Sequence, residues 1–142
     1  MHPHIRRRAR ECALQFLYAW DITREDPESA LEAFWSITSA KTAARNYAEK
    51  LIHLYTMNHE TLDAEIAAVI ENWSPQRVGR IEQAAIRMAY TEMKLMPDVP
   101  PSVAINEAIE VTKLYGSDEA PRFVNGVLDR LRKNALAPEH EA

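Results

Sequence analysis

The sequence predicts an all-α fold, a compact bundle of about seven helices. Apolar residues recur at intervals of three and four along most of the chain, and no segment alternates between apolar and polar residues as a strand does. Only three glycines occur in 142 residues, which argues against a hairpin-rich sheet and against a glycine-rich phosphate loop. We expect one domain over residues 1–142, with flexible ends at about residues 1–5 and 134–142.

The first expected helix covers about residues 7–22. One of its faces is apolar and consists of Ala9, Ala13, Phe16 and Trp20. Tyr18 falls outside this apolar face. Asp26 followed by Pro27 is typical of a helix start, because aspartate caps the first turn and proline lacks only a donor that would stay unpaired there. A second, shorter helix is therefore expected up to about Thr38.

Five further helices are expected at about residues 41–58, 59–72, 80–95, 102–115 and 120–133. Gly79 interrupts the helical pattern, so the third of these helices is expected to start near Arg80. Three prolines between residues 97 and 101 predict a loop. After this loop, Ser102 marks a helix start and Gly116 marks a helix end.

Positive charge is concentrated at the N-terminus. The chain carries a net charge of −4, whereas residues 1–24 hold five basic and two acidic side chains. Arg6, Arg7, Arg8 and Arg10 lie where the first helix begins, although cations in a first turn oppose the helix dipole by about 0.3–1 kcal/mol each. Contact with a polyanion would explain this cluster. Pairing with acidic residues elsewhere in the fold explains it equally well.

No arrangement of residues predicts catalysis, a cofactor or a metal site. The five histidines lack HExxH or Cys/His ligand spacing, and no serine lies in a nucleophile elbow. The single cysteine, Cys12, excludes an intramolecular disulfide and is expected in the core. Because the sequence has neither an 18-residue apolar run nor a signal peptide, we expect a cytoplasmic protein without a membrane partner.

Most aromatic residues, Tyr115 among them, fall at core spacing along their helices. Phe123 follows Arg122 just inside the start of the last expected helix. An exposed aromatic ring beside an arginine can stack on an unpaired base, which contributes about 1–3 kcal/mol. Core packing is the alternative role of Phe123, and the residues alone favour it.

Four separated segments together resemble one known family. They are RRRARECALQFLY at residues 6–18, AIRMAYTEM at 85–93, VAINEAIE at 103–110 and FVNGVLD at 123–129. Their order and spacing resemble the NusB family of bacterial transcription antitermination factors across essentially residues 5–131.

The resemblance implies two small packed helical subdomains and a function without catalysis. It implies binding to the boxA element of ribosomal RNA leader transcripts as a heterodimer with NusE, a small-subunit ribosomal protein. That complex would join RNA polymerase and suppress premature termination, and some family members form homodimers instead. By position, the resemblance implies phosphate contacts for Arg6, Arg7, Arg8 and Arg10, a continued RNA path at Arg122 and Phe123, and NusE contacts for Tyr18 and Glu82.

A helical protein-interaction module without direct RNA binding is the main alternative function. RNA methyltransferases also contain a NusB-like domain, but this sequence has no catalytic domain and no glycine-rich cofactor loop. A DNA-binding helix-turn-helix is disfavoured because the basic residues cluster at a chain end. Asp118 and Glu119 repel phosphate, so the Arg122–Phe123 half of the RNA site is expected to be weak without NusE.

Overall fold

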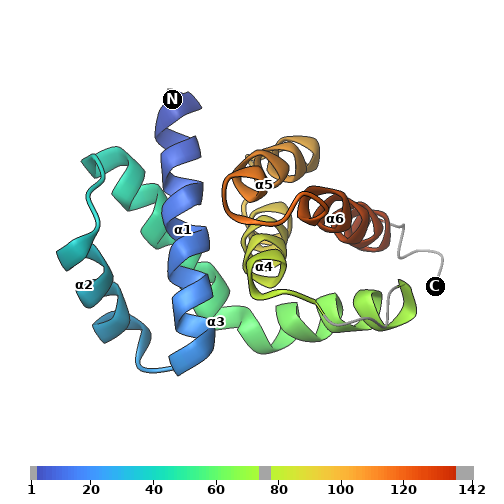
Figure 1. Cartoon of the computed structure of the whole chain (residues 1–142), viewed down its shortest axis with the longest axis horizontal. Helices are drawn as coiled ribbons and strands as arrows, with labels where there is room; N and C mark the ends of the chain where they lie inside the picture. The colour runs from blue at the N-terminus through green and yellow to red at the C-terminus, as the bar shows by residue number, and fades with distance from the viewer. Residues whose placement is uncertain (1–2, 74–77, 137–142) are drawn as a thin grey trace.

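A computed structural model describes residues 3–73 and 78–136, which form six α-helices and no strand (Figure 1). The helices are α1 (Pro3–Thr23), α2 (Pro27–Ile37), α3 (Thr42–Trp73), α4 (Arg80–Leu95), α5 (Pro101–Tyr115) and α6 (Ala120–Leu136). The predicted all-α class is confirmed. The predicted count of about seven is wrong by one, because residues 41–58 and 59–72 belong to one continuous helix. The predicted flexible ends lie partly outside the described residues.

The α3 helix stays continuous because nothing in its middle breaks it. No glycine or proline occurs there, and the Asn58 side chain donates a hydrogen bond to the Leu54 carbonyl at 2.8 Å. The shift in apolar pattern marks a change of packing partner. Near Tyr55 the helix contacts Trp20 of α1, whereas Asp63 contacts Arg87 of α4 at 3.2 Å.

The first two helices follow their local signals closely. The predicted apolar face of α1 is buried, with no member more than 6% exposed. The side chain of Asp26 accepts a hydrogen bond from the Ser29 amide at 3.0 Å, and Pro27 opens α2. Both the predicted cap and the predicted start are therefore confirmed.

In the second half of the chain, α4 begins at Arg80 as predicted, and α5 begins slightly earlier than predicted. The cap of α5 is Pro100, and the helix begins at Pro101, so Ser102 lies inside the first turn. Gly116 ends α5 with extended backbone (φ −101°). A Cβ atom at Gly116 would lie 2.8 Å from the Cβ of Ala120, so glycine lets the start of α6 approach the end of α5.

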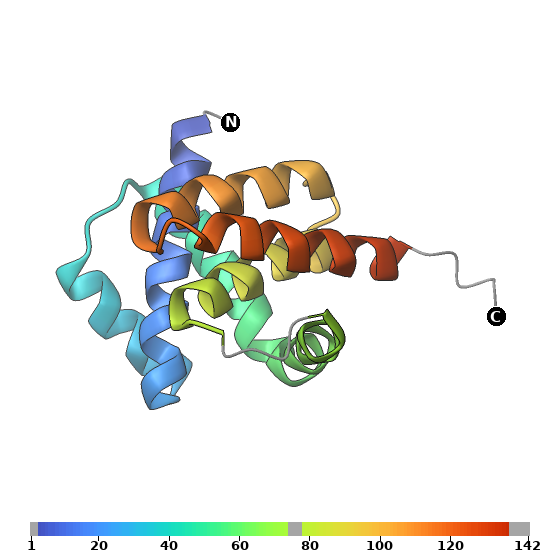
Figure 2. The same ribbon diagram turned by 45° about the vertical axis from the view of Figure 1, so that its right-hand side comes forward.

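The helices form two packed groups. One group contains α1, α2 and the first half of α3, and the other contains α4, α5 and α6 (Figure 1). Helices α1 and α3 both pack against α4, which joins the groups. Figure 2 shows α5 and α6 side by side, with the end of α5 and the start of α6 beside α1. None of the described helices has the length and apolar character needed to cross a membrane.

Candidate nucleic-acid interface

Arg10 is buried between the two helical groups. Its side chain is 3% exposed, and its Nε and Nη2 atoms donate hydrogen bonds to the Glu92 carboxylate at 2.8–3.0 Å. Glu92 of α4 is fully buried and also accepts a hydrogen bond from the Tyr47 hydroxyl. Burial lowers the pKa of Arg10, but the hydrogen bonds and charge of Glu92 outweigh it and raise the pKa overall.

The surroundings of Arg10 do not favour the phosphate contact that the family resemblance implies. A side chain enclosed in this way does not reach an RNA backbone without moving α1. Its guanidinium instead forms an ion pair with Glu92, and its Nη1 atom lies 3.4 Å from Glu107. We therefore assign Arg10 a structural role: it neutralises a buried carboxylate and fixes α1 against α4.

Arg7 points outward and forms a bidentate ion pair with Glu107 of α5. Its Nε and Nη2 atoms lie 2.6 and 2.8 Å from the two carboxylate oxygens. The Arg7 side chain is 41% exposed and the Glu107 side chain 21%. The hydrogen bond between them raises the pKa of Arg7 and lowers that of Glu107. A phosphate that binds Arg7 through the same two nitrogens must displace Glu107.

Arg6 and Arg8 are also partly exposed, and their contacts are looser. Arg6 lies over the ring of Tyr47, 4.8 Å from its centroid, and 3.8 Å from the exposed carboxylate of Asp98. Arg8 lies 3.2 Å from Glu11 on the same helix. Its Nη2 atom also donates to the Ser39 carbonyl at 2.8 Å, which ties α1 to the segment before α3.

Arg122 and Phe123 lie in the first turn of α6. Arg122 is exposed and makes no ion pair with any residue in 3–73 or 78–136, while Phe123 is partly buried against the core. Helix α5 contacts α1 through Glu107 on Arg7 and again through the Tyr115 hydroxyl, 2.8 Å from Gln15.

These two contacts show how the predicted halves of the RNA site are placed. They are eight residues apart on each helix, or about 12 Å. Because α6 follows the end of α5, Arg122 and Phe123 lie at the Gln15 end of the contact. The arginine cluster lies at the Glu107 end of the same contact.

Of the two predicted partner residues, Tyr18 lies further along α1 and Glu82 lies in the first turn of α4. Tyr18 is 37% exposed. Ile22, one turn later, is 57% exposed and was not among the residues predicted from the sequence. Asp21 pairs with Arg80 at 3.3 Å, which brings the first turn of α4 next to the last turns of α1. Tyr115, which the sequence placed in the core, is 38% exposed nearby. Ile22 follows Tyr18 by four residues, so both lie on one side of α1 outside its apolar face. This spacing could have predicted that Ile22 is exposed.

No set of three or more His, Cys, Asp or Glu side chains in the described part of the chain is arranged to hold a metal ion. The side chains at this surface include guanidinium groups, carboxylates and aromatic rings. Guanidinium groups bind phosphates, and aromatic rings stack on unpaired bases.

Comparisons with known proteins agree with the fold and with the motifs. A model of the NusB family matches residues 7–133. The transcription antitermination protein NusB of Serratia proteamaculans is 40% identical over 131 residues, which cover 92% of this chain and 94% of that protein. The NusB protein of Trichlorobacter lovleyi is 40% identical over 89% of both chains.

Solved structures give the same result. A crystal structure of the antitermination factors NusB and NusE in complex with dsRNA contains a chain that superposes with a TM-score of 0.82 at 27% identity. The match covers 94% of this chain and 99% of that one. The NusB protein of T. maritima superposes with a TM-score of 0.80 at 31% identity over 96% of this chain and 95% of that one.

Proposed function

Because this chain belongs to the NusB family, we propose that it acts as a transcription antitermination factor. In this proposal the whole chain is one RNA-binding domain that binds boxA RNA of ribosomal RNA transcripts together with NusE. The complex then acts with RNA polymerase to suppress premature termination. The observation that carries the proposal is 40% identity over 92% of the chain to a protein named for antitermination.

The proposed RNA contacts use the exposed arginines of α1. Arg6, Arg7 and Arg8 bind phosphates, and a bidentate guanidinium–phosphate contact replaces the carboxylate contact that Arg7 makes in the free protein. Arg10 holds α1 in place from beneath. Arg122 contributes a further phosphate contact at the start of α6.

Base recognition requires groups other than these cations, because phosphate contacts carry no sequence information. The exposed edge of Phe123 stacks on an unpaired base in this proposal, while its remaining surface stays packed on the core. The proposed RNA path between the two halves follows α1 and α5, whose two contacts lie about 12 Å apart along each helix.

NusE is proposed to bind the surface formed by Tyr18, Ile22 and Glu82. Tyrosine and isoleucine side chains that are 37% and 57% exposed provide an apolar centre, and the charged first turn of α4 provides a polar edge. The known assembly of a similar chain with NusE and dsRNA supports this choice of partner.

One observation favours the alternative of a protein-interaction module without direct RNA binding. Each of the four arginines has a carboxylate within 4 Å, so much of the local positive charge is already compensated. Under this alternative the arginines hold α1 on its neighbours, and only the Tyr18–Ile22 surface binds a partner.

A fluorescence anisotropy titration separates the two functions. Labelled boxA RNA and a scrambled RNA of equal length are titrated with the full chain, with and without NusE. The proposal expects tighter binding of boxA than of the scrambled RNA, with a larger difference when NusE is present. Equal affinity for both RNAs while NusE binds would support the alternative.

A further inference from the structure

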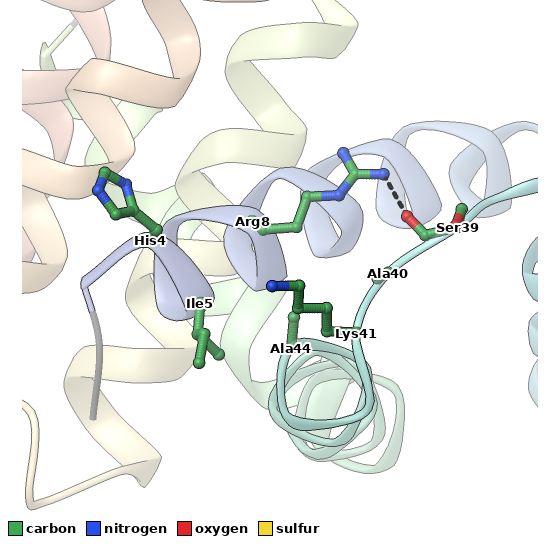
Figure 3. Close-up of a pocket in the computed structure, with 7 residues that line it drawn as sticks. All are labelled: His4, Ile5, Arg8, Ser39, Ala40, Lys41 and Ala44. Atoms are coloured by element: carbon green, nitrogen blue, oxygen red, sulfur yellow. Dashed lines mark hydrogen bonds between the residues drawn. The ribbon is translucent and has the colours of Figure 1, made fainter.

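A pocket of about 680 Å³ lies beside the arginine cluster, between the first turns of α1 and the start of α3 (Figure 3). This volume lies within the usual range for ligand sites, about 300–1,000 Å³. From α1 the pocket is lined by His4, Ile5 and Arg8, and from the segment that enters α3 by Ala40, Lys41 and Ala44.

The lining of this pocket selects for an anion. Arg8 and Lys41 are basic side chains, and none of the described residues that line the pocket has a carboxylate. The first turn of α3 also contains no acidic residue. By contrast, a second pocket between α2 and α3 is lined by three glutamates, Glu28, Glu32 and Glu49.

Lys41 differs from the arginines because its charge is not compensated. It is exposed and makes no ion pair with any residue of the described chain, whereas Arg6, Arg7 and Arg8 each lie close to a carboxylate. An anion can therefore bind Lys41 without displacing an internal partner. Figure 3 shows its side chain extending from the start of α3 toward α1.

Arg8 fixes the position of the Lys41 segment. Its Nη2 atom donates to the Ser39 carbonyl at 2.8 Å, two residues before Lys41 (Figure 3). The pocket also has an apolar surface, formed by Ile5, Ala40 and the buried Ala44. A ligand that joins an anionic group to a less polar body matches both parts of this lining.

We propose that this pocket binds one phosphate of single-stranded RNA, with the adjoining ribose or base against Ile5 and Ala44. The inference rests on the proposed function and extends the RNA site from α1 to the segment that precedes α3. RNA bound there crosses α1 in the direction away from α5. Lys41 makes the phosphate contact, and Arg8 holds the segment and adds positive charge.

Lys41, just before α3, and Lys50, within α3, provide a matched test. Lys41→Ala and Lys50→Ala each remove one exposed lysine that has no ion pair among the described residues, and Lys50 does not line the pocket. Lys41→Ala is expected to weaken RNA binding about fivefold at 0.1 M salt and to make the salt slope shallower by about 0.7. Lys50→Ala is expected to leave both unchanged.

Equal RNA affinity and equal salt slope for the two variants would overturn the pocket assignment while wild-type RNA binding persists. Absence of RNA binding by the wild-type chain would instead overturn the proposed function together with the pocket. The two failures are therefore distinguishable in one experiment. Circular dichroism of both variants checks that helical content is unchanged.

A titration followed by nuclear magnetic resonance distinguishes RNA from free phosphate as the occupant. Single-stranded RNA, adenosine 5′-monophosphate and inorganic phosphate are added separately to the full chain. The proposal expects RNA to shift the Ile5 methyl and Lys41 amide signals at lower concentration than either small molecule. Shifts that inorganic phosphate produces and RNA does not would overturn it.

Discussion

Arg7 and Arg10 lie one turn apart on α1 and have opposite surroundings. Arg10 is enclosed with the fully buried Glu92, whereas Arg7 meets Glu107 at the surface. Removal of one member of a buried ion pair leaves the other charge without compensation, whereas an exposed pair contributes little. Arginines of the same cluster therefore differ in how much stability the fold loses when each one is removed.

Arg10→Ala is expected to lower the free energy of unfolding by about 3–5 kcal/mol, because the carboxyl group of Glu92 stays buried without its ion-pair partner. Arg8→Ala, which removes a partly exposed side chain, is expected to cost less than about 1 kcal/mol. Urea denaturation at pH 7 measures both. Similar midpoints for the two variants would show that Arg10 has no special structural role.

Glu107 competes with RNA for Arg7 in this account. Glu107→Gln removes the negative charge but keeps a side chain of similar size, so Arg7 becomes available to phosphate. We expect RNA binding to tighten by severalfold at 0.1 M salt, on the order of one additional phosphate contact. Asp129→Asn, on α6 and paired with Lys133, is the control and is expected to bind RNA as the wild-type chain does.

The same carboxylate makes stability depend on pH. The hydrogen bond from Arg7 is the main cause that holds the pKa of Glu107 below its usual 4.5, so the folded state binds this proton less readily than the unfolded state. The resulting stabilisation is fully present above about pH 4.5 and is lost as the pH falls through the lower folded-state value. Wild-type and Glu107→Gln chains should therefore differ more in unfolding free energy at pH 7 than at pH 3. A difference that grows on acidification would contradict this assignment.

At the scale of elements, α1 links two proposed surfaces. Its first turns carry Arg6 to Arg8, and its last turns carry Tyr18 and Ile22. From Arg6 to Tyr18 the helix rises by about 18 Å. RNA and NusE can therefore bind the same helix side by side, and changes at one end need not alter the other.

Ile22→Glu is expected to weaken NusE binding at least tenfold, because a charge replaces an apolar side chain at the centre of the proposed contact. RNA binding by the chain alone should change little. Ile37→Glu on α2 is the matched control, since Ile37 is 87% exposed and lies on another element. Isothermal titration calorimetry with NusE measures both variants, and equal weakening would place the contact elsewhere.

Helix starts that depend on local chemistry could be predicted, as Asp26–Pro27 and Arg80 illustrate. The expected boundary at residue 59 was wrong because the apolar pattern changed with the packing partner of α3, which only tertiary structure determines. The position of the arginine cluster was visible in the sequence. The pairing of these arginines with carboxylates could not be predicted, because Arg7 and Glu107 are 100 residues apart in the sequence and Arg10 and Glu92 are 82 apart.

For the molecule as a whole, the packing of α1, α4 and α5 brings acidic residues to the basic N-terminus. The free chain therefore presents a cluster whose charge is partly neutralised, although four arginines lie within ten residues. RNA binding must exchange internal carboxylates for phosphates at Arg7. The same exchange is not needed at Lys41 or Arg122, which are uncompensated among the described residues.

The most direct test of the account is the salt dependence of boxA RNA binding by a variant with Arg6, Arg7 and Arg8 all changed to Ala. If these arginines neutralise three phosphates, the slope of log K against log salt should become shallower by about 2. A control with Lys50, Arg132 and Lys133 changed to Ala removes the same formal charge elsewhere and should keep the wild-type slope. An unchanged slope in the α1 variant, with helical content preserved, would contradict the claim that this cluster binds RNA.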